Sequence, residues 1–100
     1  MSIADAVAAS TVVLLRTANP FEVFLVRRSD SIAFMGGAHV FPGGRVDAAD
    51  EIADVDAMVE GTPRAISRML DVPANVAIAQ HVAALRELFE EAGVLLARPL

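Results

Sequence analysis

The sequence contains no cysteine among its 100 residues, so neither a disulfide nor a thiolate metal site can form. Any metal ion must therefore be held by oxygen or imidazole. Basic residues are also few, since eight stand against thirteen acidic ones and leave a formal net charge of −5. Affinity for nucleic-acid backbones comes largely from clustered positive charge, so we expect no nucleic-acid polymer as partner. A small anionic ligand stays compatible with this charge.

Long apolar runs are missing too. The longest are far shorter than the roughly 20 residues that cross a bilayer. The first ten residues carry Asp5 but no arginine or lysine, unlike the basic start of a signal peptide. The sequence therefore predicts no membrane partner and a cytoplasmic location. Because 55% of the residues are apolar, we expect a folded chain that forms one domain or part of one.

Two segments near the start of the chain predict a β-hairpin. Residues 10–17 and 21–28 are rich in β-branched and aromatic residues, and an Asn-Pro pair between them favours a turn. A shorter strand is expected at residues 39–41, where the Pro-Gly-Gly of residues 42–44 would stop it. We expect functional groups to gather around that stop.

The middle of the chain predicts a helical insertion at about residues 51–74. This segment is rich in alanine and acidic residues. Thr62 is suited to cap a short helix, and Pro63 is suited to the first turn that follows. The sequence therefore favours two short helices with a break between them.

A longer helix is expected at about residues 76–92, with Asn75 as its cap and Gly93 at its end. Residues 94–96 would start another strand. Apolar residues recur along this helix at helical spacing and are predicted to face the core: Ile78, Val82, Leu85, Phe89 and Ala92.

Three carboxylates, Glu87, Glu90 and Glu91, fall on one face of this helix near its end. In an arbitrary protein such a face is usually only solvated. Here, however, the negative end of the helix dipole disfavours carboxylates, and Glu87 repels Glu91 at i, i+4. A hard cation such as Mg²⁺, which prefers carboxylate oxygens, would offset both effects. The pattern therefore favours a metal site.

This segment resembles the Nudix hydrolase family. Residues 86–94, RELFEEAGV, match the second half of the Nudix box, R-E-U-x-E-E-x-G-U with U aliphatic, at every specified position. The FPGG of residues 41–44 is similar to the turn where the box begins. The resemblance implies an α/β fold of the Nudix type, an α/β/α sandwich. Its N-terminal portion would consist of the β-hairpin, the short strand, the helical insertion and the Nudix helix.

The resemblance also implies roles for single residues. Mg²⁺ or Mn²⁺ would be held by three carboxylates and one carbonyl, those of Glu87, Glu90, Glu91 and Gly44. Glu87, Glu90 and Arg86 would be the catalytic residues, with Arg86 orienting the glutamates through ion pairs. Metal ions suit a pyrophosphate substrate because they polarise phosphoryl oxygens and lower the pKa of a bound water.

Two basic residues, Arg27 and Arg28, end a predicted strand close to the Pro-Gly-Gly turn. Charged strand ends are usually only solvated. The neighbouring predicted site nevertheless makes these arginines candidates for binding the phosphates of the substrate.

The first half of the box departs from the family pattern. The pattern places a glutamate six residues after the second glycine, whereas here Asp50 stands there with Glu51 next to it, and a long acidic segment follows before Arg86. The sequence leaves open whether Asp50 or Glu51 pairs with Arg86. In having a box divided by a helical insertion, the sequence resembles the Nudix branch that includes the peroxisomal coenzyme A diphosphatases.

These features predict a Nudix hydrolase that cleaves the pyrophosphate bond of a nucleoside diphosphate linked to another group, with coenzyme A or an acyl-coenzyme A as candidate substrate. A homodimer is compatible with them. One alternative is a Nudix-fold binding or regulatory protein without catalysis, against which the intact glutamates argue. Another is an acidic helical adaptor with a β-hairpin. A complete Nudix domain needs more sheet and a second packing helix, so residues 1–100 are expected to be the N-terminal portion of a single Nudix domain.

Overall fold

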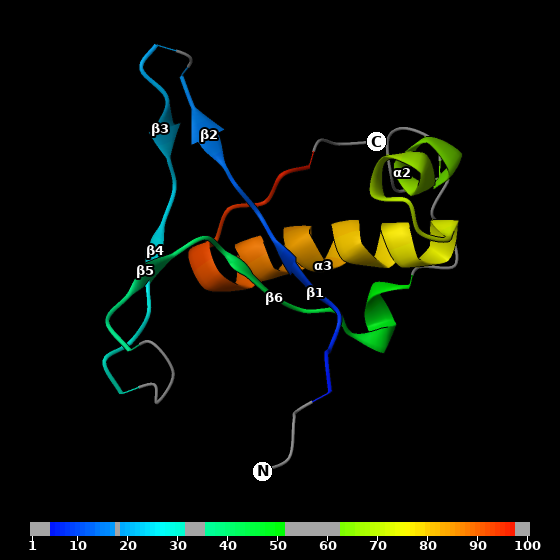
Figure 1. Ribbon diagram of the computed structural model, residues 1–100. Helices are drawn as coiled ribbons and strands as arrows, with labels where there is room; N and C mark the ends of the chain where they lie inside the picture. The colour runs from blue at the N-terminus through cyan, green and yellow to red at the C-terminus, as the bar shows by residue number, and fades with distance from the viewer. Residues whose placement is uncertain (1–4, 18, 32–35, 52–62, 98–100) are drawn as a thin grey trace.

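The computed structural model describes residues 5–17, 19–31, 36–51 and 63–97. The chain is mixed α/β, as predicted (Figure 1). The elements follow one another as β1 (Ala9–Thr11), β2 (Leu15–Arg16), β3 (Glu22–Val23), β4 (Val26–Arg27), β5 (His39–Val40), β6 (Gly43–Arg45), the 3₁₀ helix η1 (Ala48–Asp50), α2 (Pro63–Leu70) and α3 (Ala74–Ala92).

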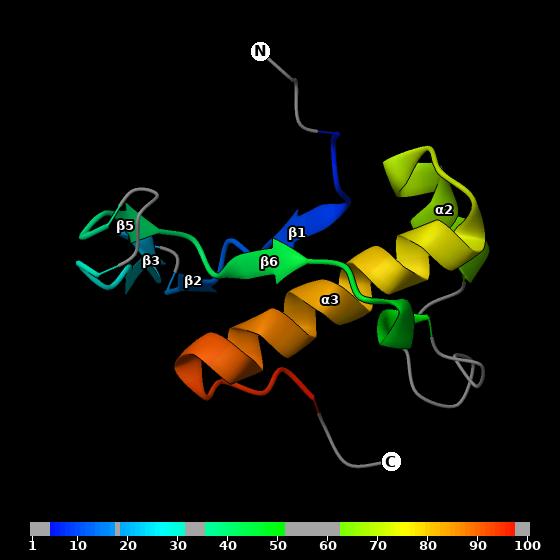
Figure 2. The ribbon, with the colours of Figure 1, turned by 90° about the horizontal axis from the view of Figure 1, so that it is seen from below.

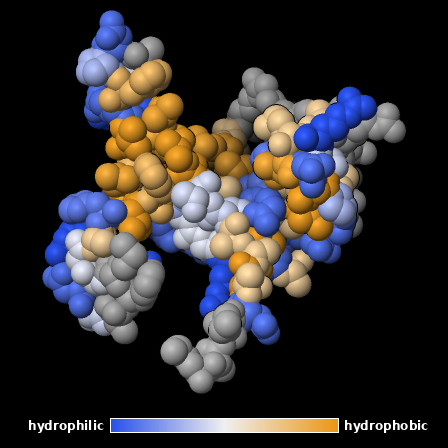
Figure 3. All heavy atoms as spheres, viewed as in Figure 1, coloured by the Kyte–Doolittle hydropathy of each residue, from blue (hydrophilic) through white to orange (hydrophobic). Residues whose placement is uncertain are grey.

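Each described strand has one antiparallel partner. The predicted hairpin is present as β2 paired with β3, in a register that places Leu15 opposite Val23. The strands before and after this hairpin pair with later parts of the chain: β1 pairs with β6, and β4 pairs with β5. Figure 3 shows apolar side chains gathered over β2, β3 and β4, and Leu15 and Val23 are among the exposed ones.

The predicted short strand is present as β5 and ends before Pro42, but the sequence analysis missed the strand that follows. Gly43 and Gly44 lie in this strand, β6, opposite Thr11 and Ser10. The Pro42 carbonyl accepts a hydrogen bond of 2.8 Å from the Val12 N–H. At Gly43 the backbone of β1 approaches so closely that a Cβ atom would overlap it. Gly43 therefore permits the close pairing of β6 with β1.

The long helix α3 begins two residues before its predicted start. Pro73 precedes it with φ −55°, and its carbonyl accepts a hydrogen bond of 3.0 Å from the Ala77 N–H. Asn75 therefore lies inside the first turn and does not cap the helix. The predicted end is confirmed, because Gly93 adopts a left-handed φ of 70° and its N–H donates to the Phe89 carbonyl at 2.8 Å.

The buried residues of α3 lie mainly in its first half, where two elements pack against it. Figure 2 shows the β1–β6 pair crossing this helix, with α2 packed near the beginning of the helix. Ile78 is buried as predicted, whereas Leu85 and Phe89 are 38% and 52% exposed and Leu88 is fully buried instead. Phe89 lies within about 20° of Ile78 around the helix, but α2 covers only the beginning of α3. The predicted apolar face is therefore buried at Ile78 and wrong at Leu85 and Phe89.

Residues 94–97 form no strand, and Leu95 and Leu96 are exposed. No described segment supplies a strand to pair with them, so the predicted extra strand is not formed. In the insertion, α2 starts at Pro63 as expected. Thr62 and the first predicted insertion helix, residues 52–60, lie outside the described residues. Within the described part, no helix has the length and apolar character required to cross a membrane.

Candidate metal centre

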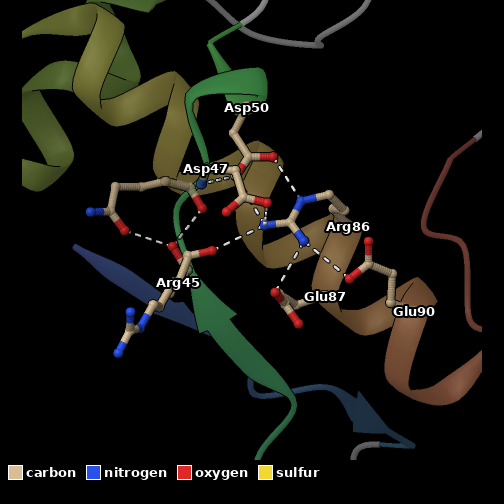
Figure 4. A network of polar contacts seen from close by, with 8 residues as sticks. Arg45, Asp47, Asp50, Arg86, Glu87 and Glu90 are labelled. Atoms are coloured by element: carbon tan, nitrogen blue, oxygen red, sulfur yellow. Dashed lines mark hydrogen bonds and ion pairs between the residues drawn. The ribbon is translucent and has the colours of Figure 1, made fainter. Parts of the chain in front are cut away.

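The carboxyl half of α3 meets β6 and η1 at a network centred on Arg86 (Figure 4). The Arg86 Nε donates to Asp50 Oδ1 at 2.8 Å and Nη2 donates to Asp50 Oδ2 at 3.0 Å. This is a two-point contact of the kind that fixes a guanidinium in one plane. The Asp50 side chain is only 2% exposed, whereas Glu51 is exposed. The structure therefore settles the open question, because Asp50 is the partner of Arg86.

The remaining donors of Arg86 are also used. Nη2 donates to the carbonyl of Arg45 at 3.0 Å, and Nη1 donates to Glu87 Oε1 at 3.0 Å and to Glu90 Oε2 at 3.1 Å. A guanidinium has five N–H donors, and each now has an acceptor. Arg86 thus contacts both segments that resemble the halves of a Nudix box, and two of the three carboxylates predicted to bind metal.

Asp50 is held by the backbone of its own turn as well as by Arg86. Its Oδ2 accepts a hydrogen bond of 2.7 Å from the N–H of Asp47, the residue just before η1. The hydrogen bond from Arg86 keeps the pKa of Asp50 below its ordinary value, against the opposing effect of burial. The same contact raises the pKa of Arg86 further above its already high value. Both groups are therefore charged in any ordinary buffer.

β6 places the backbone of Gly44 directly against Glu87. A Cβ atom at residue 44 would overlap the Glu87 carboxyl group, so any other residue here would require that carboxyl group to move. Glu87 is 17% exposed, and it is held between Gly44 and Arg86. Glycine at this position therefore serves the placement of a carboxylate.

Glu91 differs from the other two glutamates. It is exposed, and among the described residues its side chain takes part in no hydrogen bond or ion pair. Within the described segments, no three His, Cys, Asp or Glu side chains are arranged together as a ready metal site. The donor set nevertheless suits Mg²⁺ or Mn²⁺, because it consists of carboxylate oxygens beside the closely approaching backbone of Gly44. The residues fit such an ion once their side chains turn toward it.

The two candidate phosphate-binding arginines stand at the end of β4. Arg27 forms an ion pair of 2.7 Å with Asp30 within the segment that leads from β4 to β5. The Arg28 backbone bonds to Ala38 and Gly37 in the same unit.

Two contributors were missed from the sequence. The carbonyl of Arg45 accepts from Arg86, and the Asp47 carboxylate lies 3.4 Å from Arg86 Nη2. A backbone carbonyl leaves no sequence signal. Asp47 could have been noticed, because it stands three residues before Asp50, the spacing of a helix-capping pair.

Comparisons with known proteins agree with this geometry. No protein-family model matches the chain. The crystal structure of a NUDIX hydrolase from Alicyclobacillus acidocaldarius, however, is similar over 96% of this chain and 40% of that one, with a TM-score of 0.67 and 33% identity. The resemblance to the Nudix family and the prediction of a Nudix-type fold are thereby confirmed.

Curated relatives narrow the resemblance to one branch. The human acyl-coenzyme A diphosphatase NUDT19 is 39% identical over 107 aligned positions, which cover 82% of this chain and 28% of the human protein. The Gallus gallus protein of the same name is 35% identical, over 79% of this chain and 26% of its own length. The chain thus spans about a quarter of the length of these relatives, and its similarity to the acyl-coenzyme A diphosphatase branch is confirmed.

Proposed function

We propose that the chain supplies the metal-binding part of a hydrolase that cleaves the pyrophosphate bond of a nucleoside diphosphate derivative. The observation that carries this proposal is the network in which Arg86 joins Asp50 to Glu87 and Glu90. The names of the relatives support coenzyme A or an acyl-coenzyme A as the substrate. The chain aligns with only about a quarter of the length of those relatives, so we propose their activity for it.

Glu87, Glu90 and Glu91 would hold Mg²⁺ or Mn²⁺ together with the carbonyl of Gly44. The bound ion would polarise a phosphoryl oxygen and lower the pKa of a water. Arg86 would position Glu87 and Glu90 without touching the substrate, because all its donors are already engaged.

Substrate phosphates would meet Arg27 and Arg28 in this proposal. Their place at the end of β4 supports it only in part, because Arg27 is paired with Asp30 and would have to exchange that partner for phosphate. The remainder of a Nudix domain would complete the site around the substrate, with residues 51–74 as an insertion between the halves of the box.

The test assays the complete product of the gene with Mg²⁺ against coenzyme A, an acyl-coenzyme A, ADP-ribose, NADH and nucleoside triphosphates. Glu90→Gln should lower turnover at least about a hundredfold, because the metal supplies several kcal/mol of transition-state stabilisation. Glu22→Gln is the matched control, since Glu22 pairs with Arg16 in the distant β2–β3 hairpin. Unchanged turnover in Glu90→Gln would refute the metal assignment, and metal binding without turnover of any substrate would favour a binding protein.

A further inference from the structure

We propose that Arg86 is a built-in competitor of the divalent cation, because its Nη1 occupies the place between Glu87 and Glu90 that the cation needs. The inference rests on the proposed metal function and goes one step beyond it. The contacts through which Arg86 orients the glutamates would then lower their affinity for the cation. The metal-free protein would carry its own positive charge in the site.

The guanidinium is the fixed member of this arrangement. Nε and Nη2 hold both oxygens of the buried Asp50, and Nη2 also donates to the Arg45 carbonyl. A guanidinium is planar, so fixing two of its nitrogens fixes the third. Nη1 consequently cannot retreat from the carboxylates unless the contact with Asp50 breaks.

The glutamates are the members that can move. Glu90 is 55% exposed and contacts Nη1 through one oxygen, and Glu87 also uses a single oxygen. Both carboxylates are drawn onto Arg86, whereas Glu91 makes no described contact. This division explains why three carboxylates on one helical face form no ready metal site among the described residues. Cation binding therefore requires two charge-assisted hydrogen bonds to Nη1 to be weakened or exchanged.

The test measures the Mn²⁺ affinity of the complete gene product from the electron paramagnetic resonance signal of free Mn²⁺. Arg86→Lys keeps the positive charge, but one ammonium group cannot hold Asp50 and both glutamates together. Competition predicts that this variant binds Mn²⁺ about two- to fivefold more tightly, the range expected for losing a partly exposed ion pair. Arg16→Lys is the matched control and should leave affinity unchanged, because Arg16 pairs with Glu22 in the β2–β3 hairpin, outside the site.

Asp50→Asn is a second variant with the same expected sign. It keeps the shape of the side chain but removes one of the two acceptors that fix the guanidinium, so Nη1 can move away from Glu87 and Glu90 and Mn²⁺ should bind more tightly. Lower affinity in a folded Arg86→Lys variant would overturn the inference, since a purely orienting Arg86 predicts that result. Should Arg86→Lys not fold by circular dichroism, weaker binding in Asp50→Asn would overturn it instead. Absence of Mn²⁺ binding in every form, wild type included, would refute the proposed metal function itself and the inference with it.

Discussion

Replacing Glu91 by glutamine should stabilise the metal-free protein, whereas the same change at Glu87 should not. The structure separates these two residues. Glu87 accepts a hydrogen bond from Arg86 and lies against Gly44, so its charge is compensated. Glu91 has no described partner and is the second-last residue of α3, where the helix dipole is negative. Its charge is the uncompensated one.

The size of the effect follows from that position. A carboxylate in the last turn of a helix is unfavourable by about 0.3–1 kcal/mol. For a domain of this size each kcal/mol shifts Tm by about 4–8 °C, so Glu91→Gln should melt roughly 1–8 °C above wild type in EDTA. With Mg²⁺ the order should reverse, because only wild type keeps all three carboxylates. Ten millimolar Mg²⁺ at a Kd near 1 mM would add about 1.4 kcal/mol to the folded state.

The assay is a set of thermal melts for wild type, Glu91→Gln and Glu87→Gln at one ionic strength, each in EDTA and in Mg²⁺. Glu87→Gln is the matched control because it makes the same chemical change in the same helix. If Glu91→Gln melts at or below wild type in EDTA, the dipole argument fails. If Mg²⁺ leaves the wild-type curve unchanged as well, the glutamates have only a structural role.

Three further predictions concern neighbouring residues. The pKa of Asp50 in the folded state lies below its ordinary value of 3.8, so its charge stabilises the fold above that pH. This stability is lost as the pH falls through the lower, folded-state pKa. The Tm of the wild type should therefore drop below about pH 4, and Asp50→Asn should show a shallower drop. Gly44→Ala requires the Glu87 carboxyl group to move and should weaken Mn²⁺ binding, and unchanged affinity would contradict the role of Gly44 in placing Glu87. Arg27→Ala should leave Mn²⁺ affinity unchanged while raising KM for the phosphate substrate, and an equal loss of metal binding would contradict the assignment of Arg27 to substrate.

Local patterns predicted the parts of the fold that depend on neighbours in sequence. The end of α3 at Gly93 and the shared face of Glu87 and Glu90 follow from helical geometry alone. The strand through Gly43 did not, because its pairing depends on β1, more than thirty residues earlier. Likewise, Leu85 and Phe89 are apolar at helical spacing, but which part of a helix becomes buried is decided by where the strands and α2 pack against it.

The divided box shows why the central pairing could not be read from the sequence. Asp50 and Arg86 are 36 positions apart, and adjacent acidic residues at 50 and 51 offered two partners. The choice is made by η1, whose short turn directs Asp50 inward, where its Oδ2 also accepts the Asp47 N–H. Glu51 follows the turn and stays exposed.

An insertion at about residues 51–74, as the sequence predicts, would be tolerated because the contact between the two parts of the site joins residues on either side of it. Asp50 ends η1 just before the predicted insertion, and Arg86 belongs to α3 after it. The link between them is made by both oxygens of one buried carboxylate, so it does not depend on the length of chain that joins the two residues. Loop closure becomes only slowly more unfavourable as a loop lengthens, whereas a buried charge without its partner is strongly destabilising. Extra residues here therefore perturb the carboxylates far less than the loss of either Asp50 or Arg86 would.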